Sequence, residues 1–531
     1  MQYLGKLPNI FLAILSGLLL AASWIYPFTF LIFIAWIPLL IAEQKISESL
    51  SAKRKSLKIT GLSYLTFFIW NILTTWWIYY ASFGGLCLAV VTNSLLMSIV
   101  FTTYFNIKKR INNPDSYRSW GIWLLIPMWL GFEYGHTLWD LSWTWLTLGN
   151  VFAFAPDVVQ WYELTGTSGG SLWILIINIL FLKIINQKLK LLGIIFIPII
   201  FSFIIKTYRS SNPRTPNSKF QTVIVQPNVD PYNEKFNLEP KVQLQNFCNQ
   251  IKGKLNQETD YLVMPETFLT EYVRENELEN SFSIKFLRDS ILLKYPNLTI
   301  ITGASTMYIF KEGEKLTSTA DKFSDADIYY DSYNTAIQIN KGGIKLYHKS
   351  KLVPGVERMP FPALFKPLEK LAINLGGTMG SLGLQDERTV FFSKNNSVGI
   401  APVICYESVY PDYVGQYIRN GANIIFIITN DGWWDDTPGY KHHLAYARLR
   451  AIETRCQIAR CANTGISCFI DELGNIEQAT KWWEQAVIQK DLNVSKGKTF
   501  FVRCGDVISY ASVTIALLFL VYGQFLRFRK R

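Results

Sequence analysis

The pattern of hydrophobic and polar positions divides the chain into an apolar part and a mixed part. Eight charge-poor apolar segments lie before residue 206 or after residue 506: 9–24, 28–42, 59–80, 84–106, 120–135, 168–182, 191–205 and 507–526. Each is close to, or slightly shorter than, the roughly 17–25 residues that a transmembrane helix requires. The pattern therefore predicts eight membrane spans. A second apolar segment directly follows the first, so the N-terminus is expected to be retained.

The stretch between residues 207 and 500 has a different pattern, in which short apolar runs alternate with amphipathic segments. The segment 438–455 begins with a proline and repeats apolar residues at helical spacing. Other runs are apolar without alternation, which is typical of strands buried on both faces of a sheet: 220–226, 261–264, 298–303, 398–405 and 422–429. This stretch is predicted to form one α/β domain.

The distribution of charge orients the predicted spans. Lys and Arg total 52 against 40 Asp and Glu, and the net charge of +12 fits either a nucleic-acid-binding protein or a membrane protein with basic loops. The gaps at 25–27, 81–83 and 136–167 contain no Lys or Arg, whereas basic residues gather in the alternate gaps: 45–58, 108–118, 183–190 and 527–531. The positive-inside rule therefore places both termini in the cytoplasm, and no nucleic-acid partner is expected.

Spans and orientation together predict three parts of the chain. Residues 1–206 form a polytopic α-helical membrane domain of seven transmembrane helices, and residues 207–500 form an extracytoplasmic α/β domain. Residues 501–531 comprise the eighth helix and a basic cytoplasmic tail. Charged residues make up only 17% of the chain, below the roughly 25% of a soluble domain, which agrees with this organisation.

The numbers of cysteine and histidine argue against a metal site. The chain has seven Cys, without paired Cys-x-x-Cys spacing, and four His. A structural zinc site usually draws four ligands from such pairs. Three of the cysteines lie in one strand-rich segment and are expected to be small buried hydrophobic residues: Cys456, Cys461 and Cys468. Neither a metal nor a cofactor is expected.

Residues with reactive side chains follow predicted strands of the α/β domain. Cys405 ends one strand and is followed by Tyr406 and Glu407; Glu266 ends a second strand, and Lys349 follows a third. Sheets of this class place their sites at the carboxyl ends of strands, so these side chains are candidates for one site. Each also has an ordinary explanation, as a core cysteine, a solvated carboxylate or an exposed lysine.

Taken together, these residues resemble the nitrilase superfamily, whose members hold a Glu-Lys-Cys triad in an αββα sandwich. The resemblance rests on Pro-Glu at 265–266, Tyr-His-Lys-Ser-Lys-Leu-Val-Pro at 347–354 and Ile-Cys-Tyr-Glu at 404–407. Further segments are similar to the apolipoprotein N-acyltransferases, the branch of the superfamily with an eight-span membrane domain: 163–169, 429–434, 443–453 and 460–467. The resemblance covers nearly the whole chain.

The resemblance implies an acyltransferase of the bacterial inner membrane whose catalytic domain faces the periplasm. Such an enzyme transfers an acyl chain from a phospholipid to the N-terminal S-diacylglyceryl cysteine of a lipoprotein, the last step of lipoprotein maturation. The implied partners are the phospholipid donor, the lipoprotein acceptor and membrane lipid. The protein is expected to act as a monomer, without a cofactor.

The resemblance also implies roles within the site. Cys405 forms a thioester with the acyl group, Glu266 is the general base in both halves of a ping-pong reaction, and Lys349 stabilises the substrate oxygen. Further residues are expected to support this triad: Glu357, Tyr406 and Glu407.

Several alternatives stay open at the level of sequence. Lys351 is the alternative to Lys349 as the inward-pointing lysine, and the Gly-rich stretch 376–384 is a candidate lid. Some tryptophans are candidates for substrate contact, with an ordinary interfacial belt as the alternative: Trp143, Trp145, Trp161 and Trp433. The competing functions are a membrane-tethered nitrilase or amidase that uses water as acceptor, and a non-catalytic membrane scaffold.

Overall fold

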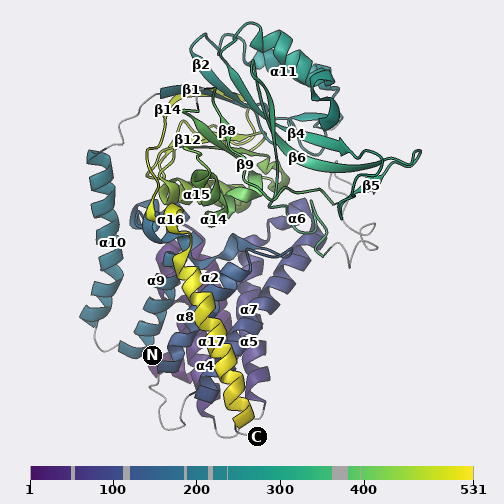
Figure 1. Cartoon of the computed structure of the whole chain (residues 1–531). Coiled ribbons are helices and arrows are strands. Elements are labelled where there is room, and N and C mark those ends of the chain that lie inside the picture. Colours follow the sequence, from purple (N-terminus) through teal and green to yellow (C-terminus); the bar gives the residue numbers. More distant parts are fainter. Residues whose placement is uncertain are drawn as a thin grey trace. The chain divides into compact units, whose positions relative to one another are not determined.

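The computed structural model describes residues 2–49, 54–111, 120–184, 188–212, 219–235, 237–361, 381–394 and 396–529. The chain forms two compact units (Figure 1). The first, which we call the helical unit, comprises residues 1–79, 83–211 and 504–531. The second, which we call the α/β unit, comprises residues 80–82 and 212–503. The helical unit thus combines the N-terminal part of the chain with its C-terminal helix.

The helical unit consists of α-helices joined by short 3-10 turns. Its N-terminal helices are α1 (Gln2–Lys6), α2 (Asn9–Ser23), η1 (Phe28–Leu31), α3 (Ile32–Ala35), α4 (Ile37–Glu48), α5 (Lys55–Thr75) and α7 (Phe83–Ile111). They are followed by η2 (Trp120–Leu124), α8 (Leu125–Gly135), η3 (Thr144–Leu146), η4 (Leu148–Phe154), η5 (Pro156–Val158), α9 (Tyr162–Ile184) and α10 (Lys188–Ser211). Helix α17 (Val507–Arg529) ends the unit.

The length and composition of the helices support a membrane protein. Among the described residues, five helical stretches are long and apolar enough to cross a bilayer: Phe28–Glu48, Phe83–Ile111, Tyr162–Lys183, Gly193–Ser211 and Val507–Phe528. Helix α2 is apolar but has only 15 residues. The expected span 59–80 falls largely in α5, and the span 120–135 is divided between η2 and the 11-residue α8. The predicted count of eight spans is therefore not confirmed.

Side-chain hydrogen bonds connect helices inside this unit. The side chain of Asn178 accepts a bond from the backbone N–H of Trp36 (3.0 Å) and donates to the carbonyl of Ile32 (2.9 Å), where the helix is interrupted between α3 and α4. Asn93 in α7 donates to Asn71 in α5 at 2.7 Å. Such bonds satisfy polar groups that water cannot reach in a bilayer.

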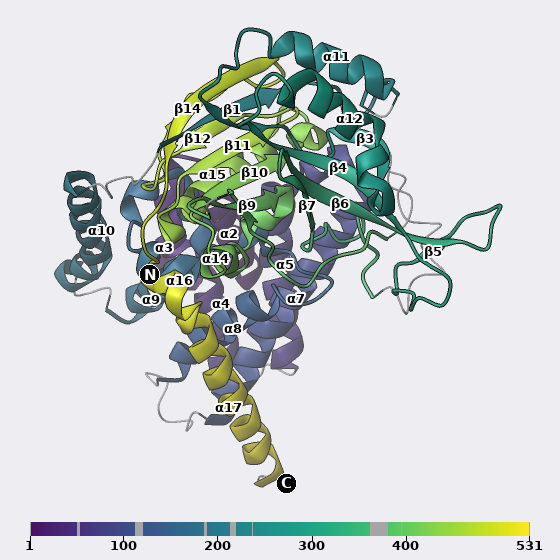
Figure 2. The same cartoon turned by 45° about the horizontal axis from the view of Figure 1, so that its top comes forward.

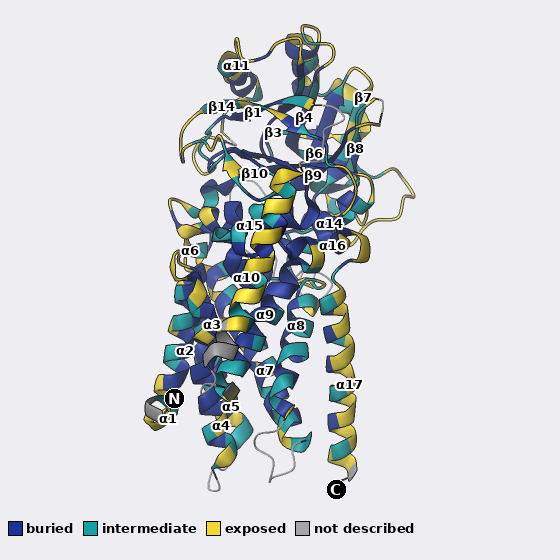
Figure 3. Ribbon diagram, turned by 90° about the vertical axis from the view of Figure 1, so that its left-hand side faces the viewer, coloured by how far each residue is buried: buried dark blue, intermediate teal, exposed yellow. Residues whose placement is uncertain are grey.

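Helix α17 is exposed along most of its length within this structure (Figure 3). The exposed side chains are large and apolar, and more than half of each is accessible: Leu517, Leu518, Val521, Phe525 and Phe528. Lipid tails are as apolar as these side chains, so a bilayer accommodates this surface without the cost it would have in water.

The α/β unit has two sheets in the described residues. The eight-stranded sheet has the order β14-β1-β2-β4-β6-β5, with β3 paired to β4 and β7 paired to β6. Its strands are β1 (Lys219–Gln226), β2 (Thr259–Val263), β3 (Leu269–Arg274), β4 (Thr299–Ile309), β5 (Asp321–Lys322), β6 (Tyr329–Asn340), β7 (Gly343–His348) and β14 (Ala486–Asn493). The six-stranded sheet has the order β13-β12-β11-β10-β9-β8, with β8 (Phe391–Phe392), β9 (Gly399–Ile404), β10 (Ile424–Thr429), β11 (Ile458–Ala462), β12 (Cys468–Ile470) and β13 (Ile476–Glu477).

Helices cover the outer faces of the two sheets (Figure 2). Helices α11 (Pro240–Gln250) and α12 (Phe282–Leu287) share a core with the eight-stranded sheet, into which Phe247 and Ile284 project. On the other side, α14 (Pro411–Arg419) packs against β9, and α15 (Pro438–Thr454) packs against α14. Each helix buries an apolar face on its neighbour, which is the usual way in which layers of secondary structure are stabilised.

The inner faces of the two sheets pack on one another. The rings of Tyr261 in β2 and Phe426 in β10 meet edge to face with centroids 5.6 Å apart. The thiol of Cys461 in β11 donates to the carbonyl of Val225 in β1 at 3.2 Å. Strands β9 and β10 are buried at every residue, which explains their unbroken apolar sequences. The expected nitrilase-like α/β sandwich is confirmed.

Strand direction brings the candidate residues to one end of the sandwich. Strands β2 and β4 are parallel, and β7 runs the same way because antiparallel β6 separates it from β4. Lys349 directly follows β7, and Glu266 comes three residues after β2. In the other sheet, Cys405 directly follows β9, which is parallel to β10 and β11. The carboxyl ends of these strands therefore supply the candidate site.

Candidate functional site

Cys405 occupies a sharp turn between a strand and a helix. It is the first residue after β9 and begins the 3-10 turn η9 (Cys405–Val409). Its φ of 48° lies in the left-handed region, which costs a non-glycine residue about 1–3 kcal/mol. The Cys405 carbonyl accepts a bond from the Ser408 hydroxyl at 2.8 Å and lies 3.1 Å from Nε2 of His443. These contacts hold the strained turn that presents the thiol.

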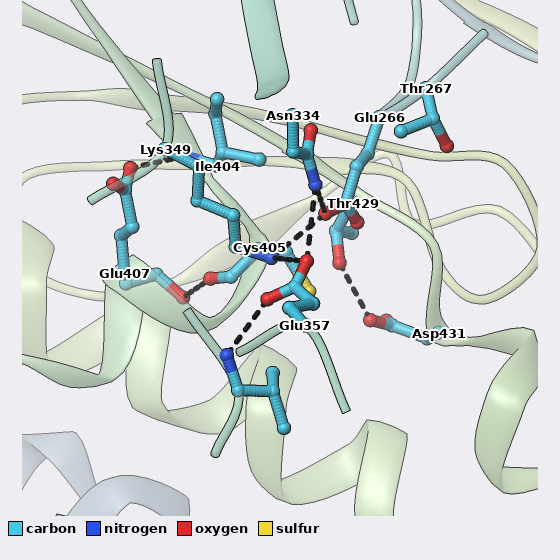
Figure 4. A network of polar contacts seen from close by, with 12 residues as sticks. Glu266, Thr267, Asn334, Lys349, Glu357, Ile404, Cys405, Glu407, Thr429 and Asp431 are labelled. Atoms are coloured by element: carbon cyan, nitrogen blue, oxygen red, sulfur yellow. Dashed lines mark hydrogen bonds and ion pairs between the residues drawn. The ribbon is translucent and has the colours of Figure 1, made fainter. Parts of the chain in front are cut away.

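Glu266, Lys349 and Glu357 form one buried cluster (Figure 4). The ammonium of Lys349 is 1% exposed and donates to Oε1 of Glu266 at 3.0 Å and to Oε1 of Glu357 at 2.7 Å. The Asn334 side chain also donates to both carboxylates, at 2.8 Å and 3.2 Å. Two residues of the expected triad are thus in direct contact, and the expected supporting residue Glu357 is the second partner of the lysine.

The charges in this cluster stabilise one another. Burial raises the pKa of Glu266, but Lys349, Lys235 and the hydrogen bond from Asn334 outweigh it, so the pKa lies below its ordinary value. Burial lowers the pKa of Lys349, but Glu266, Glu357 and Cys405 raise it well above its ordinary value. The carboxylate of Glu266 and the ammonium of Lys349 are therefore both ionised at neutral pH.

The thiol of Cys405 stays protonated in the resting site. Burial raises its pKa well above the ordinary value and Glu266 adds to this, while Lys349 and a hydrogen bond with the Thr429 side chain act in the opposite direction. A thiol nucleophile must lose its proton as it attacks. The site therefore combines a protonated nucleophile with an ionised carboxylate that can accept the proton.

Glu407 links the turn of Cys405 to the end of β7. Its Oε1 accepts hydrogen bonds from the hydroxyls of Tyr347 (2.6 Å) and Tyr413 (2.7 Å) and from the backbone N–H of Ser350 (2.7 Å). Its Oε2 accepts from the backbone N–H of Ile404 at 2.8 Å. These contacts fix the residues next to Lys349 and Cys405 in the chain, so Glu407 acts on Lys349 through the backbone. The ring of Tyr406 meets that of Tyr410 edge to face at 5.3 Å.

A second buried network lies on the carbonyl side of Cys405. Asp431 is the first residue of η10 (Asp431–Trp434); its Oδ1 is 2.9 Å from Nδ1 of His443, and its Oδ2 accepts from Arg460 at 2.6 Å. Burial raises the pKa of Asp431, but Arg460 and His443 lower it to about 2. The imidazole bridges this carboxylate to the Cys405 carbonyl, so the network determines how the Cys405 turn is held.

A cavity of about 150 Å³ connects the reactive groups. Its reactive lining residues are Glu266, Lys349, Glu357 and Cys405. Apolar and aromatic side chains form much of the rest of its wall: Tyr272, Tyr333, Val353, Val356, Leu382, Trp433 and Trp434. Ala81, the last residue of α6 (Ile78–Ala81), also lines it. This is an apolar pocket with a few converging polar groups, the usual form of a small-molecule site.

The expected substrate-contacting tryptophans fall into two groups. Trp433 lines the cavity, and its ring meets that of Tyr232 at 5.1 Å. The other three belong to the helical unit and pack with neighbouring aromatic rings. Trp143 stacks on Trp145 at 5.8 Å, and Trp161 meets Trp173 edge to face, also at 5.8 Å.

The structure distinguishes the two candidate lysines by their contacts. Whereas Lys349 contacts both carboxylates, the ammonium of Lys351 lies 5.0 Å from the centre of the Tyr410 ring. Burial and the nearby Arg388 lower the pKa of Lys351 to about 8. Most of the candidate lid, residues 376–380, lies outside the described residues.

Two residues of the site were not singled out from the sequence. Asn334 lies within β6 and reaches the Glu266 cluster because β6 pairs with β7. Lys235 lies in the loop after β1 and contacts Glu266 and Thr267. No local sequence pattern marks either residue; only the pairing of distant segments places them here. Across the described ranges, no group of three or more His, Cys, Asp or Glu is arranged to hold a metal ion.

Comparisons with known proteins match both parts of the chain. Residues 224–499 match the carbon-nitrogen hydrolase family, and residues 16–180 match the apolipoprotein N-acyltransferase N-terminal domain. The apolipoprotein N-acyltransferase of Chlorobaculum tepidum is 30% identical, over 95% of each chain. That of Thermotoga maritima is 25% identical, over 96% of this chain and 93% of the relative. Among solved structures, Nit3 of Saccharomyces cerevisiae, from the nitrilase superfamily, has a TM-score of 0.38 at 18% identity, covering 56% of this chain and 95% of Nit3.

Proposed function

Since the chain belongs to the apolipoprotein N-acyltransferase family, we propose that it N-acylates bacterial lipoproteins with a membrane phospholipid as the acyl donor. It is an acyltransferase with a carbon-nitrogen hydrolase domain. The acceptor is the α-amino group of an S-diacylglyceryl cysteine at the start of the lipoprotein, and the reaction is the last step of lipoprotein maturation. The observation that carries the proposal is the opening of Glu266, Lys349 and Cys405 onto one largely apolar cavity.

In the first half of the reaction, the Cys405 sulfur attacks the carbonyl carbon of a phospholipid acyl ester. Glu266 accepts the thiol proton as the carbon–sulfur bond forms. It then delivers that proton to the leaving alkoxide oxygen as the carbon–oxygen bond breaks. The products are a thioester on Cys405 and a lysophospholipid. The protonation states of the resting site suit this order. The high pKa of Cys405 leaves the proton on sulfur, and the low pKa of Glu266 leaves its carboxylate ionised and able to accept that proton.

In the second half, the neutral α-amine of the lipoprotein attacks the thioester carbonyl carbon. A carbon–nitrogen bond forms, and Glu266 accepts a proton from the nitrogen. The carbon–sulfur bond then breaks, and Glu266 returns the proton to sulfur. The thiol is regenerated and the lipoprotein carries a new amide. Because the first product leaves before the acceptor reacts, the kinetics are ping-pong.

Both steps pass through a tetrahedral intermediate with negative charge on the former carbonyl oxygen. The ammonium of Lys349 is buried among the reacting groups, where such a charge is poorly screened and its attraction is strong. Glu357 and Asn334 support this role, since both contact the Lys349–Glu266 pair. Tyr406, Glu407, Trp143, Trp145, Trp161 and Trp433 remain proposed supporting or substrate-contacting residues.

We place the α/β unit on the periplasmic side of the inner membrane, with both termini in the cytoplasm and the protein as a monomer. In this topology, residues 1–206 form seven membrane spans, residues 207–500 form the catalytic domain, and residues 501–531 form the eighth span and the cytoplasmic tail. This placement is supported by the lack of Lys and Arg in the gaps between spans that would face the periplasm: 25–27, 81–83 and 136–167.

The proposal is tested by incubating the purified full-length protein with labelled phospholipid and measuring its intact mass. We expect an acyl adduct that hydroxylamine removes, that never forms in Cys405→Ser, and that a diacylglyceryl peptide with a free α-amine discharges. Cys248→Ser is the matched control, because Cys248 is a partly buried cysteine of α11 that does not line the cavity. Absence of the wild-type adduct, or hydrolysis of soluble amides without lipid, would contradict the proposal.

A further inference from the structure

A second buried lysine, Lys235, contacts the backbone of Glu266, whereas Lys349 contacts its carboxylate. The side chain of Lys235 is 2% exposed, and its ammonium donates to the backbone carbonyl of Glu266 at 3.1 Å. It also donates to the hydroxyl of Thr267. Taking an ammonium out of water is costly, so a lysine is rarely buried unless its charge is paired and hydrogen-bonded. Its contacts place Lys235 directly on the turn that carries the proposed general base.

The loop after β1 holds Lys235 in this position through its own hydrogen bonds. The side chain of Asp230 accepts a hydrogen bond from the backbone N–H of Tyr232 at 2.8 Å. The backbone carbonyl of Asp230 accepts one from the backbone N–H of Lys235 at 2.9 Å. One residue earlier, Val229 exchanges two bonds with the side chain of Asn463, at 3.1 Å and 2.8 Å. The lysine is therefore presented by an ordered turn that is anchored to the end of β11.

The turn that Lys235 contacts is closely confined on another side by Gly303. The backbone N–H of Gly303 donates to the carbonyl of Pro265 at 3.0 Å. A Cβ atom at Gly303 would lie 2.6 Å from Cα of Glu266 and 2.4 Å from the backbone nitrogen of Thr267. Thr267 itself has a φ of 46°, in the left-handed region. The Glu266 turn is thus strained and confined, and its conformation determines where the carboxylate points.

Lys235 also contributes positive charge next to the reacting groups. The charge of Lys235 lowers the pKa of Glu266 and so favours its ionised form. In turn, Glu266 and Cys405 act to raise the pKa of Lys235. Burial is the larger effect and lowers the pKa of Lys235 to about 8. The titratable groups that face it from the packed elements are Glu266 after β2 and Cys405 after β9. On its own loop, Glu234 is exposed to solvent.

We propose that Lys235 is a positioning residue of the acyl-transfer site, which clamps the Glu266–Thr267 turn against Gly303 and places a second positive charge beside Glu266 and Cys405. The inference rests on the proposed function of Glu266 and Cys405. In this role Lys235 stabilises the thiolate as it forms and keeps the carboxylate aimed at Lys349. Loss of its proton above about pH 8 removes the charge but leaves the side chain in place.

The first test measures the thiol directly and does not depend on acyl transfer. The alkylation rate of Cys405 by iodoacetamide is followed from pH 6 to 10 in the full-length protein, by mass spectrometry of the peptide that contains it. We expect the Cys405 rate in Lys235→Met to fall about tenfold at pH 7, since one nearby charge moves a buried pKa by about one unit. Lys235→Arg should retain the wild-type rate. Lys490→Met is the control, a half-buried lysine of β14 that pairs with Glu477.

The second test measures formation of the acyl-enzyme from labelled phospholipid over the same pH range. In the wild type, the rate of acyl-enzyme formation should fall above about pH 8, as Lys235 loses its charge. In Lys235→Arg, the rate should stay constant to higher pH, because a guanidinium stays charged. An alkylation profile of folded Lys235→Met that overlays the wild type would overturn the proposal. If that variant fails to fold, Lys235→Arg decides: a decline above pH 8 identical to the wild type overturns it. Absence of any wild-type acyl-enzyme contradicts the proposed function instead, and leaves the alkylation result to judge Lys235.

Discussion

Two buried carboxylates flank the candidate nucleophile, and their surroundings differ in charge. Glu266 contacts the ammonium of Lys349 at 3.0 Å and lies near that of Lys235. Glu407 instead accepts its hydrogen bonds from neutral groups, two phenol hydroxyls and two backbone N–H groups. As a result, the pKa of Glu266 is below its ordinary value, while burial raises that of Glu407 above it in spite of four donors.

This difference separates a chemical role from a structural one. A general base must be ionised and must face the substrate; Glu266 meets both conditions, because cations surround it and it lines the cavity. Glu407 does not line the cavity, and two of its four acceptor contacts join the backbone beside Lys349 to that beside Cys405. A carboxylate that accepts from many neutral donors is therefore suited to holding two segments together.

Removal of the proposed base tests the difference between the two carboxylates most strongly. In Glu266→Gln, the shape of the side chain is kept but the proton acceptor is lost. We expect acyl-enzyme formation to fall by about 10²–10⁴-fold, the usual contribution of a general base. The measurement is a single-turnover rate with labelled phospholipid, followed by intact mass.

Glu271→Gln provides the matched control, because Glu271 is a carboxylate of β3 that contacts Ser281 and does not line the cavity. Its rate should equal that of the wild type. A Glu266→Gln protein that is folded and forms the acyl-enzyme at the wild-type rate would show that the thiol proton leaves by another route. The distinction between the two carboxylates would then have no chemical meaning.

Glu407→Gln should act on stability more than on chemistry. A glutamine side chain has one acceptor oxygen, and its amide would face donors that now point at Glu407, including the hydroxyl of Tyr347. We expect the free energy of unfolding to fall by about 1–3 kcal/mol, the cost of leaving a buried donor unsatisfied. Thermal melting with a far-UV circular dichroism readout measures this, and Tyr440→Phe, which loses a bond to Asp436, is the control for an unrelated buried phenol.

The opposite result is equally informative for Glu407. A variant that melts with the wild type but cannot form the acyl-enzyme would place Glu407 among the reacting groups. The backbone bonds to Ser350 and Ile404 would then be incidental to its role.

The layers, and the meeting of Glu266, Lys349 and Cys405 at one cavity, could be predicted from the sequence because both depend on local patterns. Buried strands have unbroken apolar runs, and the reactive residues follow their carboxyl ends, as Cys405 follows β9. The positions of Asn334 and Lys235 depend instead on the pairing of β6 with β7 and on a turn anchored by Asn463, which no local pattern records. The span count was also not confirmed: α2 has only 15 residues, and the segment 120–135 is divided between η2 and the 11-residue α8, and hydropathy alone indicates neither boundary.

The smallest expected effect is the pH dependence of stability, which should have opposite signs for the two carboxylates. The ordinary pKa of both is 4.5. Glu266, with a lowered folded-state pKa, stabilises the fold above pH 4.5, and this contribution is lost only as the pH falls through its folded pKa. Glu407, with a raised folded-state pKa, contributes stability below pH 4.5 that is lost as the pH rises through its folded pKa.

Melting temperatures of the wild type, Glu266→Gln and Glu407→Gln at pH 7 and pH 5 should reveal these signs. Because burial raises the folded-state pKa of Glu407 above 4.5, lowering the pH from 7 to 5 favours its protonation in the folded wild type more than in the unfolded chain. Glu407→Gln cannot make this gain, so the difference in stability between the two proteins should widen. The difference between the wild type and Glu266→Gln should stay constant, because Glu266 is still ionised at pH 5. If instead the second difference changes and the first does not, the cations act on Glu407 and not on Glu266, and the roles assigned to the two carboxylates must be exchanged.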